Sequence, residues 1–255
     1  MRNRFILFLI LFLSGNSCKK GNPDSEQIVY LSQHCTSADT IINVIAKNPQ
    51  NFKPTVISNA LMRFYFGEEK VEARKLITYW RNHPNLSVID PYKPFLLIDL
   101  GYYYLWEGQL DSADHFITLR EKTNVTDTWN SLSFFSLKGS HAYLIKNFDA
   151  AKHIFLEGYI LANKYNINRY IEQFSVSLGA IAFQQGQYGT AAKFFSSAYA
   201  IISKEKRKNP VLINNLAACL LQESRPSQAI KVLSTLGEET SNSDLSYTGI
   251  LTKMN

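Results

Sequence analysis

Glycine and proline are scarce in this sequence, with 12 and 8 residues among 255, and most of them lie between apolar periodic stretches. Within those stretches Leu, Ile, Ala and aromatic residues recur at steps of three and four, which is helical spacing. There is no Gly-rich loop followed by Lys-Ser or Lys-Thr, and no Gly-x-Ser-x-Gly segment. The sequence therefore favours helices over sheets, and it offers neither a phosphate loop nor a nucleophile elbow.

Paired metal ligands are lacking as well. The five histidines form no i,i+3 or i,i+4 pair, and no Cys-x-x-Cys occurs. Zinc sites of ordinary spacing need such pairs. His141 follows Ser140, but neighbouring residues of a helix point in different directions, so they cannot act as nucleophile and base. We predict no catalytic residue, no metal site and no cofactor.

The excess of basic residues is small once the start of the chain is set aside. The formal net charge is +6, from 27 Lys and Arg against 21 Asp and Glu. Arg2 and Arg4 lie in the first 17 residues, so 25 basic residues and a charge of +4 remain beyond them. This charge is too weak and too scattered to indicate nucleic-acid binding. The one dense basic run, Lys204–Lys208, either offsets the dipole at a helix end or docks an acidic partner.

Residues 1–17 have the three parts of an export signal. Arg2 and Arg4 precede the apolar run Phe5–Leu13, and small residues follow it. Such a leader is typical of a secretory signal peptide. Nine apolar residues fall far short of the roughly 20 that a membrane-spanning helix needs. We therefore expect residues 1–17 to be removed.

The segment Leu13–Cys18 resembles a bacterial lipobox, in which the cysteine is lipidated and becomes the mature N-terminus. Gly15 stands where that motif usually has Leu, so ordinary signal-peptidase cleavage before Cys18 is the alternative. The polar residues 18–25 form the expected tether after the lipid. The resemblance implies a fatty acyl group such as palmitate on Cys18. It also implies a protein held on an inner or outer membrane of the bacterial cell envelope.

A regular spacing of alanines organises the middle of the chain. Each stands in the second helix of a predicted helix pair, at Ala73, Ala113, Ala151, Ala191 and Ala229. The intervals are 40, 38, 40 and 38 residues. The clearest copy covers residues 172–198, where small residues mark the point at which two helices cross. Between these helices Gly186 can take the left-handed conformation that ends a helix.

These units resemble the tetratricopeptide repeat, a helix–turn–helix unit with Leu-Gly-x2-Tyr in its first helix and Ala-x3-Phe in its second. Leu100-Gly101-x2-Tyr104 matches the first helix and Ala191-x3-Phe195 the second, whereas Ser175 replaces the usual Trp. The standard unit has about 34 residues, so the longer units here imply longer helices or loops, such as His83–Pro94. The resemblance implies an all-α fold. It also implies a right-handed α-solenoid of about five tetratricopeptide-like helix pairs with a short N-terminal helix pair.

Five segments follow from these patterns. They are a signal peptide over 1–17, a polar tether over 18–25, N-terminal capping helices over 26–53, the repeat array over 54–236, and a C-terminal tail or capping helix over 237–255. Within the third segment we expect helices over Ser25–Gln33 and Ser37–Lys47. Cys35 and Cys219 lie near opposite ends of the array, so we expect no disulfide between them. We expect Cys219 to pack as a small hydrophobic residue.

In tetratricopeptide arrays the first helices line a concave groove, and the resemblance places a binding surface there. The candidate residues are Met62, Tyr65, Phe66, Phe95, Ile98, Tyr102, Trp106, Ser140, Tyr143 and Phe183. We expect half of the first-helix face to pack in the core, and Trp106 alone could fill the junction between the first two units. The Lys, Asn and Arg of the family's carboxylate clamp are missing, which disfavours capture of a terminal carboxylate.

The sequence therefore predicts a non-enzymatic cell-envelope lipoprotein that binds an envelope protein or peptide segment through the concave face of the solenoid. Its partners are that segment and, through the N-terminal lipid, a membrane. No nucleic acid and no small-molecule cofactor are expected. Two alternatives stay open: a peptide-sensing regulatory module, and an envelope lipoprotein that captures a glycan.

Overall fold

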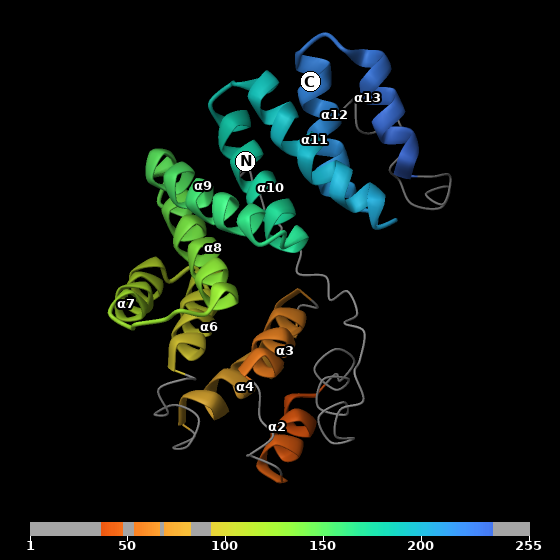
Figure 1. Ribbon diagram of the computed structural model, residues 1–255. Coiled ribbons are helices and arrows are strands. Elements are labelled where there is room, and N and C mark those ends of the chain that lie inside the picture. The colour runs from red at the N-terminus through yellow and green to blue at the C-terminus, as the bar shows by residue number, and fades with distance from the viewer. Residues whose placement is uncertain (1–36, 48–53, 67–68, 83–92, 237–255) are drawn as a thin grey trace. The chain divides into compact units, whose positions relative to one another are not determined.

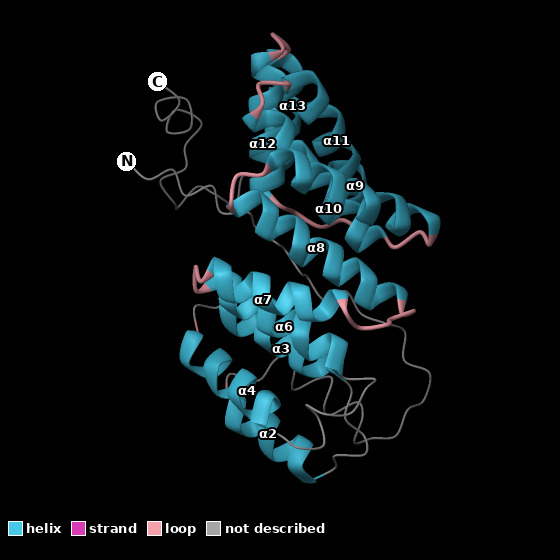
Figure 2. Ribbon diagram, turned by 90° about the vertical axis from the view of Figure 1, so that its left-hand side faces the viewer, coloured by secondary structure: helices cyan, strands magenta, loops and turns pink. Residues whose placement is uncertain are grey.

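The computed structural model describes residues 37–47, 54–66, 69–82 and 93–236, and in these ranges it contains helices and no strand (Figures 1 and 2). The predicted helix over Ser25–Gln33, the tether and lipidation site, and the C-terminal tail lie outside the described residues. The division of the chain into those segments therefore stays a prediction.

Five helix pairs follow α2 (Ala38–Lys47) in the described part of the chain. They are α3 (Pro54–Phe66) with α4 (Lys70–Asn82), α6 (Lys93–Trp106) with α7 (Leu110–Glu121), α8 (Thr128–Leu144) with α9 (Phe148–Lys164), α10 (Asn168–Gln184) with α11 (Tyr188–Lys204), and α12 (Pro210–Gln222) with α13 (Pro226–Leu233). A 3₁₀ turn, η2 (Ser234–Leu236), ends the described chain. The loop predicted over His83–Pro94 ends earlier, because α6 starts at Lys93. Proline fits the first turn of a helix, where its missing N–H costs no hydrogen bond.

The chain divides into two compact units, with the boundary between Ile154 and Phe155 inside α9. In the unit before the boundary, α6 contacts the four helices α3, α4, α7 and α8. In the unit after it, α11 contacts α10 and α12, and α12 also contacts α13. Each unit is thus built from neighbouring helix pairs that bury their apolar faces on one another, as stacked repeats do.

The alanines that define the repeat are buried where the helices of a pair meet. Four of them, Ala73, Ala113, Ala151 and Ala191, are fully buried, and Ala229 is 1% exposed. In the fourth pair a methyl group added to Gly179 of α10 would lie 2.7 Å from the Phe195 ring of α11, closer than van der Waals contact. Small residues are therefore required at this crossing, as the spacing predicts.

The turn inside each of the last four pairs has the same backbone. A residue with positive φ stands five positions before the repeat alanine, at Gly108, Lys146, Gly186 and Ser224, with φ of 74°, 63°, 72° and 56°. The next N–H donates to a carbonyl five residues earlier, as from Gln187 to Ala182 at 2.9 Å. This is a Schellman-type helix end, which glycine adopts most easily. The left-handed conformation predicted for Gly186 is confirmed.

The helix α2, predicted over Ser37–Lys47, docks on α4 through charged groups. The N–H of Ala38 donates to Glu72 Oε2 at 2.6 Å. Lys75 lies 2.9 Å from Asp39 and 3.0 Å from Glu72. The hydrogen bonds from Ala38 and Lys75 lower the pKa of Glu72. A carboxylate from another helix therefore accepts a hydrogen bond from the start of α2, where backbone N–H groups lack helical partners.

Cys219 is fully buried in the apolar cluster of the second unit, among residues of α11, α12 and α13. Burial, with a smaller contribution from Glu223, raises its pKa to about 12. The thiol is therefore uncharged and packs as a small hydrophobic side chain, as predicted. Cys35 lies outside the described residues, so the expected absence of a disulfide stays a prediction.

Candidate binding face of the first helices

The helix α6 carries the aromatic stripe that the sequence indicates as a contact surface. Tyr102 and Trp106 are four residues apart and therefore lie on one face of the helix. Their ring centroids are 5.4 Å apart and their planes are 24° from parallel, so the rings stack. Trp106 is half-buried, whereas Tyr102 is only 6% exposed. Of this pair, Trp106 has the larger accessible surface.

The hydroxyl of Tyr102 joins two first helices. It donates a hydrogen bond of 2.7 Å to Oγ of Ser136 on α8. Ser136 is itself fully buried. Tyr102 therefore holds α6 against α8 and supports the Trp106 ring from beneath, so most of its own surface is not available to a partner.

The predicted site residues fall into three groups in the structure. Buried ones are Ile98, Tyr102, Ser140 and Tyr143, while partly exposed ones are Phe95, Trp106 and Phe183. The side chains of Met62, Tyr65 and Phe66 lie outside what the structure describes, and so does Cys18. About half of the face was expected to be core, and the buried group has that role. Binding by the partly exposed group stays a prediction, and its largest ring is that of Trp106.

Tyr143 is buried and packs between neighbouring helices. Its ring meets that of Phe148 edge-on across the α8–α9 turn, with centroids 5.3 Å apart. Burial raises the pKa of its hydroxyl. The adjacent His141 places Nε2 3.1 Å from the Leu110 carbonyl oxygen at the start of α7. These side chains hold neighbouring helices together.

Asp99 is the polar residue of this face that our sequence analysis missed. It is 9% exposed and accepts a 2.7 Å hydrogen bond from the Ser58 hydroxyl of α3. Burial raises its pKa to about 8, although the hydrogen bond from Ser58 acts in the opposite direction. A signal was present in the sequence: Asp99 is the only charged residue between Lys93 and Glu107. A strongly perturbed carboxyl group on a candidate binding face is a functional-site candidate.

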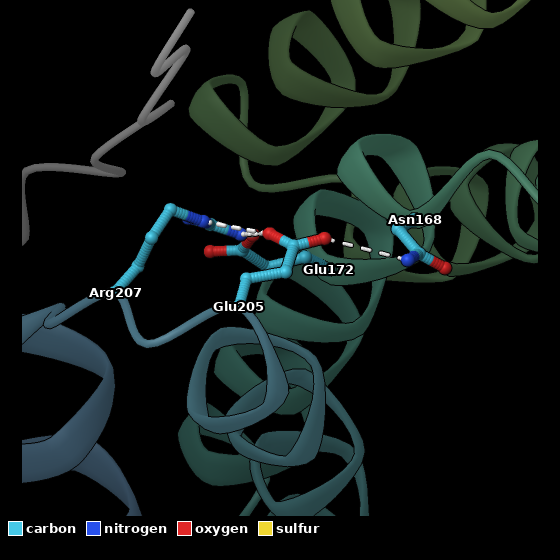
Figure 3. Close-up of polar contacts among 4 residues, drawn as sticks. All are labelled: Asn168, Glu172, Glu205 and Arg207. Atoms are coloured by element: carbon cyan, nitrogen blue, oxygen red, sulfur yellow. Dashed lines mark hydrogen bonds and ion pairs between the residues drawn. The ribbon is translucent and has the colours of Figure 1, made fainter. Parts of the chain in front are cut away.

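A second buried acid lies in the other unit, and Figure 3 shows its surroundings. Glu172 of α10 is 6% exposed, and its Oε2 lies 2.6 Å from the guanidinium of Arg207. Arg207 also pairs with Glu205 at 2.6 Å, and Glu205 accepts a hydrogen bond from Asn168 at 3.3 Å. Burial acts against the charge of Arg207, but the hydrogen bonds with Glu172 and Glu205 outweigh it and raise its pKa.

Within the basic run Lys204–Lys208, Arg207 is thus committed to an internal ion pair. The negative charge of its partner Glu172 is balanced by this guanidinium, whereas that of Asp99 has no such partner among the described residues. The network also joins the loop after α11 to the start of α10. Of the four cations that could dock an acidic partner in this run, Arg207 is thus already paired within the chain. Desolvation offsets much of the attraction in a buried pair of this kind, so its net contribution to stability is small.

The guanidinium of Arg120 at the end of α7 is also buried, at 5% exposure. Its Nε donates to Asn130 Oδ1 at 2.9 Å, NH1 donates to the Thr123 hydroxyl at 3.2 Å, and the group lies over the Phe134 ring at 4.8 Å. Burial lowers its pKa. These contacts connect the end of α7 to the start of α8, which is a structural role.

A family model for the tetratricopeptide repeat matches residues 182–253. The match covers the end of α10, the pairs around Ala191 and Ala229, and residues beyond the described chain. Residues 182–253 therefore contain tetratricopeptide repeats.

One solved structure resembles this chain in fold over most of its length. The crystal structure of BtubC (BKLC) from P. vanneervenii superposes with a TM-score of 0.57 at 14% identity, over 92% of this chain and 93% of that one. The APC/C hetero-tetramer Cut9–Hcn1 aligns with a TM-score of 0.43 at 15% identity, over 89% of this chain and 46% of that one. No curated protein sequence matches the chain. The predicted all-α fold of tetratricopeptide-like helix pairs is confirmed in the residues that the structure describes.

Tetratricopeptide repeats serve as protein–protein interaction scaffolds, and this fold is typically non-catalytic. The arrangement suits that role, because stacked helix pairs expose long surfaces that a single-core domain lacks. Among the described helices, none has the length and apolar character to cross a bilayer.

Proposed function

We propose that this tetratricopeptide-repeat protein is a cell-envelope lipoprotein without catalytic activity. Lipid on Cys18 holds it on a membrane, and its first helices bind a segment of another envelope protein. The leader over residues 1–17 and the lipobox-like Leu13–Cys18 support the anchor. The repeat architecture supports a protein partner.

One observation carries the choice of surface: the half-buried Trp106 ring lies stacked on the buried Tyr102. Large aromatic rings held rigidly from beneath lose little conformational freedom on binding, and Trp and Tyr are enriched among the residues that dominate interface energies. The partly exposed Phe95 lies on the same helix and extends the apolar surface.

Photocrosslinking tests the surface directly. With benzoylphenylalanine in place of Trp106, we expect covalent capture of one protein segment in the native envelope, identified by mass spectrometry. The matched control places the same residue at Val71 on α4, a second helix of the same unit, where the side chain is 69% exposed. Capture from position 71 but not from position 106 would show that the binding face is on the second helices.

The anchor has its own test, metabolic labelling with a fatty acid. We expect the wild-type protein to carry label and to sediment with membranes, and Cys18→Ser to lose both properties. A single acyl chain binds membranes only marginally. Stable retention of the protein on the membrane would therefore indicate that further acyl chains or basic residues also contribute to the anchor. Label that persists in Cys18→Ser would place the lipid elsewhere, and an unlabelled soluble wild-type protein would indicate ordinary secretion.

A further inference from the structure

A buried carboxyl group without a compensating charge lies within the candidate binding face of α6. Asp99 is 9% exposed, and Ser58 is its hydrogen-bond partner among the described residues, donating to Oδ2 at 2.7 Å. No Lys or Arg of the described chain forms an ion pair with it. Burying a carboxylate with so little compensation is unfavourable. Packing alone therefore gives no reason for an acid at this position.

The two buried acids of the first helices, Asp99 and Glu172, differ in their partners. Both acids lie on first helices and both are more than nine-tenths buried. Glu172 has a guanidinium at 2.6 Å, supplied by Arg207 of the same chain. At Asp99 no described residue supplies the equivalent cation.

Aromatic rings flank the carboxyl group along the helix. Residues three and four apart share a helix face, so Phe95, Tyr102 and Trp106 form one stripe with Asp99 between them. The faces of Trp and Tyr rings attract ammonium and guanidinium groups, and a carboxylate beside them adds a charge-assisted hydrogen bond. Such a combination fits a basic side chain better than an apolar or acidic one.

We propose that Asp99 anchors a lysine or arginine side chain of the bound protein segment, which enters the first-helix face beside Trp106. The inference rests on the proposed function, since it names the chemistry of the partner at that same face. The argument for a basic side chain is charge complementarity. A cation from the partner would balance the charge of Asp99, as the guanidinium of Arg207 balances that of Glu172.

Selection from a phage library of random twelve-residue peptides tests the proposal on the full mature protein at pH 8. We compare wild type with Asp99→Asn and with the control Asp114→Asn, which changes an exposed acid on α7. Peptides selected by wild type and by Asp114→Asn should contain one position enriched in Lys or Arg. The Asp99→Asn selection should lose that enrichment. Circular dichroism checks that each protein is folded.

A synthetic copy of one selected peptide then measures the contact. Replacing its conserved lysine with norleucine keeps the length of the side chain and removes the charge. We expect this change to weaken binding to wild type about tenfold, as loss of a charge-assisted contact does, and to weaken binding to Asp99→Asn less than twofold. The wild-type measurement shows whether the charge of the peptide contributes to binding, and the comparison with Asp99→Asn assigns that contribution to Asp99. If Asp99→Asn folds poorly, Asp99→Ser takes its place in this comparison.

The possible failures are distinguishable. Peptides that bind without a basic preference, or that lose equal affinity with both proteins on the norleucine change, would overturn the role of Asp99 and leave the scaffold function standing. A library from which wild type selects no peptide would overturn both proposals.

Discussion

Replacing Ala191 with Glu should destabilise the second unit by about 4 kcal/mol or more, because it places both excess volume and an unpaired charge in a packed helix crossing. Ala191 is fully buried and packs in the cluster that includes Phe195, Leu216 and Cys219. A shift of α10 away from α11 to make room for the larger side chain would break the close contact between Gly179 and the Phe195 ring. Urea unfolding followed by circular dichroism measures the loss.

The same helix offers a control of the same chemistry. Ala200 is exposed on α11, so Ala200→Glu adds the same side chain without burying it. We expect it to change stability by no more than about 0.5 kcal/mol. An Ala191→Glu protein as stable as Ala200→Glu would show that the proposed repeat register is wrong.

Replacing Asp99 with Asn should stabilise the protein at alkaline pH, by a few kcal/mol at pH 8.5. Asn has nearly the shape of Asp and can still accept the hydrogen bond from Ser58, but it carries no charge to desolvate. Near pH 4 the wild-type carboxyl is protonated in the fold, so there the two proteins should differ by less than about 1 kcal/mol.

The direction follows from the two states of the carboxyl group. In the folded protein the pKa of Asp99 is about 8, whereas an unfolded Asp has an ordinary value near 3.8. Between these values the folded protein holds a proton that the unfolded chain has released. The contribution of Asp99 to stability is therefore greatest below about pH 4 and falls by about 1.4 kcal/mol for each pH unit up to about pH 8.

Equilibrium unfolding in urea at pH 5 and pH 8.5 measures this dependence. Asp114→Asn is the control again, because its side chain is exposed and its removal should leave the difference from wild type the same at both pH values. A difference between Asp99→Asn and wild type that is also the same at both pH values would contradict the account of a buried, uncompensated acid.

The helix pairs were predictable because each repeat places an alanine at the same point, where its two helices cross. Ala113 and Ala191 stand at helix crossings where a larger side chain has no room, and Gly186 ends a helix in a conformation that glycine favours. The turn at Lys146 was less obvious. It has the same backbone as that at Gly186, but a lysine gives no local signal for positive φ.

The tertiary polar contacts were not predictable from local pattern. Glu72 receives the N–H of Ala38 from 34 residues away, and Arg207 reaches Glu172 across 35. Such pairings depend on how the helix pairs stack. Helical periodicity places Tyr102 and Trp106 on one stripe, yet it does not say that Tyr102 is buried and bonded to Ser136 while Trp106 stays partly exposed.

The central claim, that a protein partner binds the first-helix face around Trp106, is tested most directly by the affinity of Trp106→Ala for the crosslinked segment, measured beside its stability. Since Trp106 is half-buried and its clearest contact is the stack on Tyr102, its loss should cost about 1 kcal/mol of stability. Binding should weaken by about 2 kcal/mol or more, as at an interface hot spot. A loss of about 3–5 kcal/mol in stability, with normal binding by the folded fraction, would show that Trp106 is a core residue and would contradict the claim.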